Sequence, residues 1–105
     1  MRLLSKKELN IRLIKAYPLL RLNNNQIPDV DFVMVNDLIN SFKFSFTNWQ
    51  DIMPIAHQLG IYARPVGTGY YAQDRNITVC TKQDDVHTAL VVCCIKLLES
   101  GTCDV

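Results

Sequence analysis

The sequence predicts a small α+β domain in which helices pack on the faces of an antiparallel sheet of three or four strands. Two observations carry this prediction. Short segments rich in β-formers, joined by turns containing glycine or asparagine, occupy residues 61–80. Segments whose apolar residues have helical spacing precede and follow them. Strands joined by tight turns pair antiparallel, and helices must cover the apolar faces that such a sheet offers.

Composition predicts one globular domain. The chain has 105 residues, of which 49% are hydrophobic and 20% charged, a profile that excludes disordered and fibrous classes. No apolar run is long enough for a membrane span, and the first residues contain no apolar segment typical of a secretory signal. Two of the four cysteines, Cys93 and Cys94, are adjacent in a helical pattern and poorly placed to bond each other. We therefore expect a cytoplasmic protein with reduced thiols and no membrane partner.

The net charge of +1 conceals an asymmetry along the chain. Residues 1–21 hold six cations against Glu8 alone, which gives +5, and the remaining residues sum to −4. The cations of the first helix spread around its circumference and do not form one stripe. They are either a solvated polar face or a surface for an anionic partner, and the residues concerned are Lys6, Lys7, Arg12 and Lys15.

The first helix is predicted from about Lys6 to Tyr17. Ser5 and Glu8 have the spacing of a capping box, and Pro18 should end or kink the helix. Residues 29–41 are ambiguous. Asp29 or Asp31 is in a position to cap a helix through Phe32, Val35, Leu38 and Ile39, followed by a short strand over residues 43–46.

From residue 47 the signals are sharper. They predict a helix from Trp49 to Leu59, capped by Asn48 and closed by Gly60. Strands follow over residues 61–66, 70–73 and 77–80, with turns at residues 67–69 and 74–76. The last helix should run from Val86 to Glu99, with Asp84 or Asp85 at its start and Gly101 beyond its end.

Several of these segments resemble the small bacteriophage proteins known as the phage ABA-sandwich domain. The likeness rests on Asn48-Trp49, on residues 53–56 and 59–61, on Gly69-Tyr70-Tyr71-Ala72, and on residues 88–90 and 94–98, with a similar opening at residues 5–10. The resemblance implies a three-layer α/β/α arrangement, a phage or prophage origin and hence a bacterial host cytoplasm. It implies no activity, cofactor or catalytic residue. The sequence departs from the family pattern between Val30 and Phe46.

No catalytic, cofactor or metal constellation is predicted. His57 and His87 have no partner three or four residues away that could complete a metal face, and the cysteines lack metal-site spacing. Cys93 and Cys94 fit apolar packing, and Asp84-Asp85 fits helix capping. We therefore expect a protein that is not an enzyme.

The hairpin region offers a candidate contact surface. Aromatic and basic residues gather there within 14 positions, namely Tyr62, Arg64, Tyr70, Tyr71 and Arg75. Exposed tyrosine and arginine are enriched where proteins bind partners, and their interleaving also suits stacking on single-stranded nucleic acid. The alternative is that the tyrosines only pack beneath a helix and the arginines lie over them.

The last helix is apolar on two sides. Val86, Ala89, Leu90, Cys93 and Leu97 should face the sheet, while Val91, Val92 and Ile95 fall on the opposite side. Either the N-terminal helices or a second copy in a homodimer should cover this outer stripe. We therefore expect a single domain over residues 1–105, in which residues 1–46 complete the core of a helix–hairpin–strand–helix unit over residues 47–101.

These expectations combine into a functional hypothesis. We expect the protein to be a non-enzymatic phage or prophage accessory protein that binds a host or phage macromolecule. The partner that we favour is a protein complex. An inhibitor of a host defence system such as CRISPR is the most concrete form of this hypothesis. The alternative is a small nucleic-acid-binding protein that uses the basic N-terminal helix and the Tyr/Arg hairpin.

Overall fold

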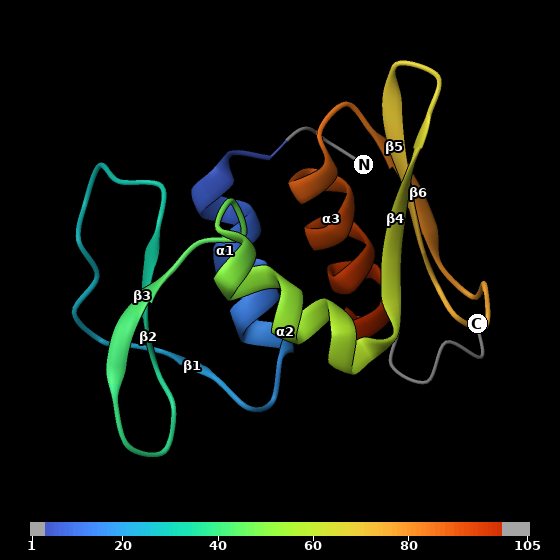
Figure 1. The fold of residues 1–105 in the computed structure, drawn as a ribbon. Coiled ribbons are helices and arrows are strands. Elements are labelled where there is room, and N and C mark those ends of the chain that lie inside the picture. Colours follow the sequence, from blue (N-terminus) through green and yellow to red (C-terminus); the bar gives the residue numbers. More distant parts are fainter. Residues whose placement is uncertain (1–3, 100–105) are drawn as a thin grey trace. The chain divides into compact units, whose positions relative to one another are not determined.

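The computed structural model describes residues 4–99 and confirms the α+β class. Helices and antiparallel strands alternate along the chain (Figure 1). Their order is α1 (Lys6–Ala16), β1 (Arg21–Leu22), β2 (Val33–Asn36), β3 (Ser41–Phe44), α2 (Trp49–Leu59), β4 (Ile61–Val66), β5 (Gly69–Asp74), β6 (Cys80–Gln83) and α3 (Val86–Glu99).

The chain divides into two compact units, with the boundary between Ser45 and Phe46. Each unit has its own three-stranded antiparallel sheet, in the order β1-β2-β3 in the first and β4-β5-β6 in the second. Two sheets therefore replace the single sheet expected from the sequence, because the unpredicted strands β1 and β2 pair with β3 in a sheet of their own. That residues 1–46 complete the core of the second unit stays a prediction.

Helix α1 begins where its capping box predicts. The Ser5 hydroxyl accepts the N–H of Glu8 at 3.1 Å, and the Glu8 carboxylate accepts the N–H of Ser5 at 2.9 Å. The helix ends at Ala16, one residue before the predicted end. Tyr17 takes extended backbone because it precedes Pro18, whose ring disfavours helical geometry at the residue before it.

The helix considered for residues 29–41 is wrong. Strands β2 and β3 pair there from Val33↔Phe44 to Asn36↔Ser41. Val33 and Val35 are buried while Met34 and Asn36 are half-buried, which is the two-residue period of a strand. The predicted strand over residues 43–46 is correspondingly displaced, since β3 begins at Ser41.

A side chain outside this hairpin holds β2 in extended form. Gln26 bonds both backbone groups of Met34: its Oε1 accepts the N–H at 2.9 Å, and its Nε2 donates to the carbonyl oxygen at 2.7 Å. The amide of Gln26 thus continues the hydrogen bonding of this edge of β2 beyond the two pairs that it makes with β1. This contact joins residues eight apart, and no local periodicity signals it.

The helices of the second unit follow the sequence closely. Gly60 closes α2 in left-handed conformation at φ 74°, as predicted. Asn48 occupies the cap position, but its amide donates to Asp51 at 3.4 Å and its oxygen caps no helical N–H. Of the two aspartates before α3, Asp85 is the cap, because its carboxylate accepts the N–H of Thr88 at 3.0 Å. The predicted stop at Gly101 lies outside the described residues.

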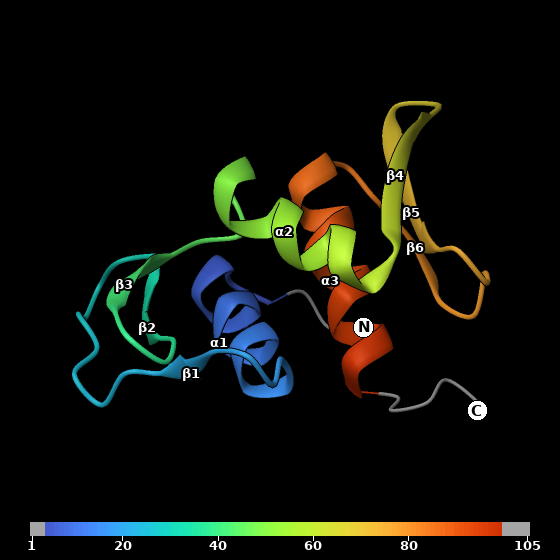
Figure 2. The same ribbon diagram turned by 60° about the horizontal axis from the view of Figure 1, so that its bottom comes forward.

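Helix α3 lies against the second sheet and also contacts α2 (Figures 1 and 2). Every residue from Ala89 to Ile95 is buried, the outer-stripe residues Val91, Val92 and Ile95 included. A helix that is apolar on all sides is stable only when all of its sides are buried, and α3 is buried in this way from Ala89 to Ile95. Within the second unit both helices lie on one face of the sheet.

Strands β4 and β5 form the predicted hairpin, in register from Ile61↔Asp74 to Val66↔Gly69. Gly69 is required there because a Cβ atom would lie 2.6 Å from the carbonyl oxygen of Gln83. The third strand was predicted over residues 77–80 but runs from Cys80 to Gln83. The displacement arises in the turn that precedes it.

Asp74 builds this turn. Its carboxylate accepts the N–H groups of Thr78 and Val79 at 2.7 and 3.0 Å, and also the Thr78 hydroxyl at 2.7 Å. These bonds hold residues 75–79 in a loop, so the β-propensity of Ile77 is overridden. Ile77 adopts a φ of 55° with two-thirds of its surface exposed, a strained conformation for a β-branched residue.

Ile77→Asn should stabilise the protein. Asparagine tolerates positive φ, and little burial is lost, so we expect the free energy of unfolding to rise by about 1 kcal/mol. Urea denaturation measures the change. Ile27→Asn is the matched control, because Ile27 is an exposed isoleucine without positive φ. Equal effects of the two substitutions would contradict the assignment of strain to Ile77.

Asp74 gives the stability a pH dependence. Burial raises the pKa of its carboxyl group, but hydrogen bonds from Val79 and Thr78 outweigh burial and hold the pKa below its usual value. A lowered folded-state pKa means that the carboxylate stabilises the fold above the unfolded-state pKa of about 3.9. This contribution disappears as the pH falls through the folded-state pKa.

We therefore expect Asp74→Asn to lower the free energy of unfolding more at about pH 7 than at about pH 3. Urea titrations at the two pH values test this difference. Asp84→Asn, at an exposed carboxylate of the same unit, is the control. A penalty for Asp74→Asn that is the same at both pH values would show that the carboxylate's charge does not matter.

Candidate functional site

The second sheet has one face covered by helices and one open to solvent. The strand registers place Arg64 opposite Tyr71, Tyr71 opposite Lys82, and Tyr62 opposite Gln73. Paired residues share a face, and alternation turns Ile61, Ala72 and Thr81 toward α3, where all three are buried. The open side, called the outer face below, is formed by Tyr62, Arg64, Tyr71, Gln73, Cys80 and Lys82.

Contacts between neighbouring strands order the outer face. The Arg64 guanidinium lies over the Tyr71 ring, 5.4 Å from its centre, and Gln73 Nε2 donates a hydrogen bond to the Tyr62 hydroxyl. A hydrogen bond between the Tyr71 hydroxyl and the Cys80 thiol raises the pKa of Tyr71 above its usual value. The side chains are thus arranged before any partner arrives, which reduces the entropy lost on binding.

The charge of the outer face has one sign. Arg64 and Lys82 are its charged members, and none of its six side chains carries a carboxylate. The acidic residue of the same strands, Asp74, points to the opposite face and is bonded in its turn. A cationic surface with aromatic rings suits an anionic partner.

The remaining predicted site residues are not members of this face. Tyr70 pairs with Pro65 and Gln83 on the opposite face, and Arg75 lies in the β5–β6 turn, packed along Gly60. The cations of α1 belong to the first unit. Lys7 Nζ donates to the carbonyl oxygen of Ile27 at 2.6 Å, so it stabilises the fold. Lys6 and Lys15 are exposed, and Arg12 is half-buried.

A shallow apolar groove adjoins the outer face. Its volume is about 270 Å³, and Trp49, Met53 and Tyr62 on its walls each expose 40–48% of their surface. Tyr62 belongs both to this groove and to the outer face. The complete lining is Trp49, Met53, His57, Ile61, Tyr62, Ala63, Val86 and Leu90.

Sequence reasoning missed this groove. Trp49, Met53 and His57 are spaced by four residues, which places them in one row along α2. This spacing is a usable signal of a shared helix face, but it does not show that Tyr62 of β4 lies beside the row. Trp49 is held by His87, whose ring centre lies 4.1 Å away, and His87 Nδ1 lies 4.0 Å from Asp85.

Catalytic groups do not converge in the residues that the structure describes. No cluster of three metal-ligating side chains exists within residues 4–99, and His57 lies exposed on α2 away from His87. Burial raises the pKa of Cys93 to about 12 and that of Cys94 still further, which keeps both as thiols. Both cysteines therefore act as packing groups, as the sequence predicted.

Within residues 4–99, no helix has the length and apolar character needed to cross a bilayer. Comparison of the chain with protein-family models, with curated proteins and with solved structures finds no match.

Proposed function

We propose that the protein is a non-enzymatic binding protein that recognises a host or phage macromolecule through the outer face of β4–β6. One observation carries the proposal. Four residues from three strands share one face with no carboxylate: Tyr62, Arg64 and Lys82 are exposed, and Tyr71 is half-buried between them. Tyrosine and arginine dominate binding energies because they combine large apolar area with directed hydrogen bonds.

A host or phage protein with an acidic surface is the partner that this face suits best. The apolar groove beside Tyr62 adds room for an aliphatic or aromatic anchor from that partner. The resemblance to phage ABA-sandwich proteins supports an accessory role in the bacterial cytoplasm, with a defence complex as one such target. Neither role requires a cofactor or a catalytic residue of this chain.

The proposal predicts that tagged protein captures a specific partner from phage-infected bacterial lysate. We expect Arg64→Ala combined with Tyr71→Ala to abolish capture, because the substitutions remove the cation and the ring at the centre of the face. Arg75→Ala is the matched control, since it removes one positive charge in the β5–β6 turn, outside this face. The proposal fails if wild-type protein captures nothing specific, or if the double variant captures the same protein.

Single-stranded nucleic acid is a second candidate partner. The specific observation that favours it is the combination of two tyrosine rings with two cations on one sheet face. Bases stack on exposed rings while lysine and arginine neutralise phosphates. Within the second unit the cations of this face are Arg64 and Lys82, and the candidate is argued from these two residues.

This second candidate predicts weak, salt-dependent binding of labelled single-stranded oligonucleotides. With two phosphate contacts, the plot of log affinity against log salt should have a slope of about −1.4. Lys82→Ala should reduce the slope by about 0.7, and fluorescence anisotropy at several salt concentrations measures both values. Absence of binding at the lowest salt concentration would exclude the nucleic-acid role and leave the protein partner.

A further inference from the structure

The β2–β3 turn of the first unit carries the most exposed aliphatic side chains of residues 4–99. Leu38 is fully exposed and Ile39 is 88% exposed. Both lie at the tip of a hairpin and contribute nothing to a core. Two adjacent aliphatic residues in water gain free energy when a partner covers them.

This tip is built as a rigid element. Asp37 Oδ1 accepts the N–H groups of Ile39 and Asn40 at 2.8 and 2.7 Å, and the Asp37 N–H donates to the Asn40 carbonyl oxygen at 3.0 Å. Below the turn, Asn36 Oδ1 accepts hydrogen bonds from Ser41 and from Asn23. A tip held in this way loses little conformational entropy on docking.

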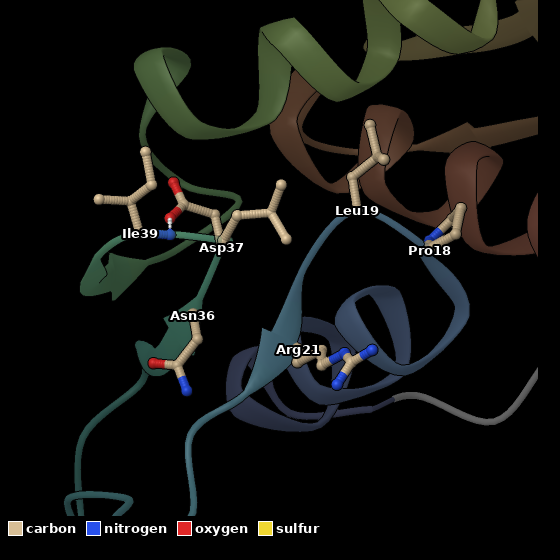
Figure 3. Close-up of a pocket in the computed structure, with 7 residues that line it drawn as sticks. Pro18, Leu19, Arg21, Asn36, Asp37 and Ile39 are labelled. Carbon is tan, nitrogen blue, oxygen red and sulfur yellow. Dashed lines mark hydrogen bonds between the residues drawn. The ribbon is translucent and has the colours of Figure 1, made fainter.

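A groove of about 690 Å³ lies beside the tip, within the same unit. Figure 3 shows Asp37 and Ile39 on one side of it and Pro18 and Leu19 on the other. Leu19 exposes 60% of its surface, so the wall of the groove opposite the tip also presents an apolar side chain to solvent. The volume falls within the range of protein pockets that bury a ligand.

The charges of the groove are complementary within a single copy. Arg21 and Asp37 both line it, one cationic and one anionic, and no ion pair of Arg21 is found among the described residues. Hydrogen bonds from the backbone of Asn40 and Ile39 lower the pKa of Asp37, which keeps it charged. The same patch therefore holds an apolar projection, an apolar hollow, a cation and an anion.

An interface with two-fold symmetry needs such a patch, because each contact of residue i with residue j is repeated as j with i. We propose that this surface binds a second copy of the chain. The Leu38–Ile39 tip of each copy enters the groove of the other, beside Leu19, and Arg21 of each copy faces the partner's Asp37. The proposal shares no residue with the outer face and does not depend on its function.

Sedimentation velocity of the full chain, from micromolar to millimolar concentration, tests the proposal. We expect a monomer–dimer equilibrium whose dissociation constant rises about tenfold or more in Leu38→Ser and in Ile39→Ser. Ile27→Ser, at an exposed isoleucine of the same unit that does not line the groove, should leave the equilibrium unchanged. Circular dichroism verifies that each variant is folded.

A charge experiment tests the symmetry of the contact. Arg21→Glu places a carboxylate opposite the partner's Asp37 and should abolish the dimer. Adding Asp37→Asn removes the repulsion while the amide oxygen still accepts the turn's N–H groups, so part of the affinity should return. A wild-type chain that stays monomeric at millimolar concentration overturns the proposal, and so does a dimer that Leu38→Ser or Arg21→Glu leaves intact.

Discussion

The second unit depends on burying α3. This helix is apolar on every side from Ala89 to Ile95, so it needs cover from more than one direction. The sheet supplies one cover and α2 another. Because the alternating strands give one face to α3, their other side chains have to face water. The packing of α3 thus determines which face of the sheet is open to solvent and carries the candidate site.

That constraint also explains the composition of the outer face. Ile61, Ala72 and Thr81 on the face toward α3 are small or apolar and buried, which lets the helix approach. The alternate positions are free of this restriction and carry tyrosine, arginine, glutamine and lysine. Strand pairing then joins residues from three strands into one surface, with Arg64 over Tyr71 at its centre. The groove beside Tyr62 extends this surface toward α2.

A second theme recurs in both units. Asp37 and Asp74 each use a carboxylate to accept backbone N–H groups, and each thereby fixes a turn between two strands. Both turns present aliphatic side chains to solvent, Leu38 and Ile39 in one and Ile77 in the other. In both turns the side-chain carboxylate bonds the backbone, so the aliphatic side chains are left on the surface of the turn.

Local signals in the sequence determined the three helices and the β4–β5 hairpin. The capping box at Ser5, the left-handed Gly60 and the turn at Gly67 act through neighbouring residues, so they could be read directly. Either Asp84 or Asp85 has a side chain that can cap α3, and only the structure shows that Asp85 accepts the N–H of Thr88. The helix considered for residues 29–41 was wrong because the backbone of β2 pairs with β1, with β3 and with the Gln26 side chain, and these contacts are not local.

The candidate site divides in the same way. The sequence by itself identified Tyr62, Arg64 and Tyr71 and placed them on a hairpin, because residue type and alternation are local properties. Only the tertiary structure added Lys82 and set Arg75 apart, because the position of β6 depends on the Asp74 turn. The β4–β5 register places Tyr70 on the face opposite Tyr71. The grooves beside Tyr62 and Leu38 are each lined by residues from several elements, so the pattern of one sequence segment cannot predict them.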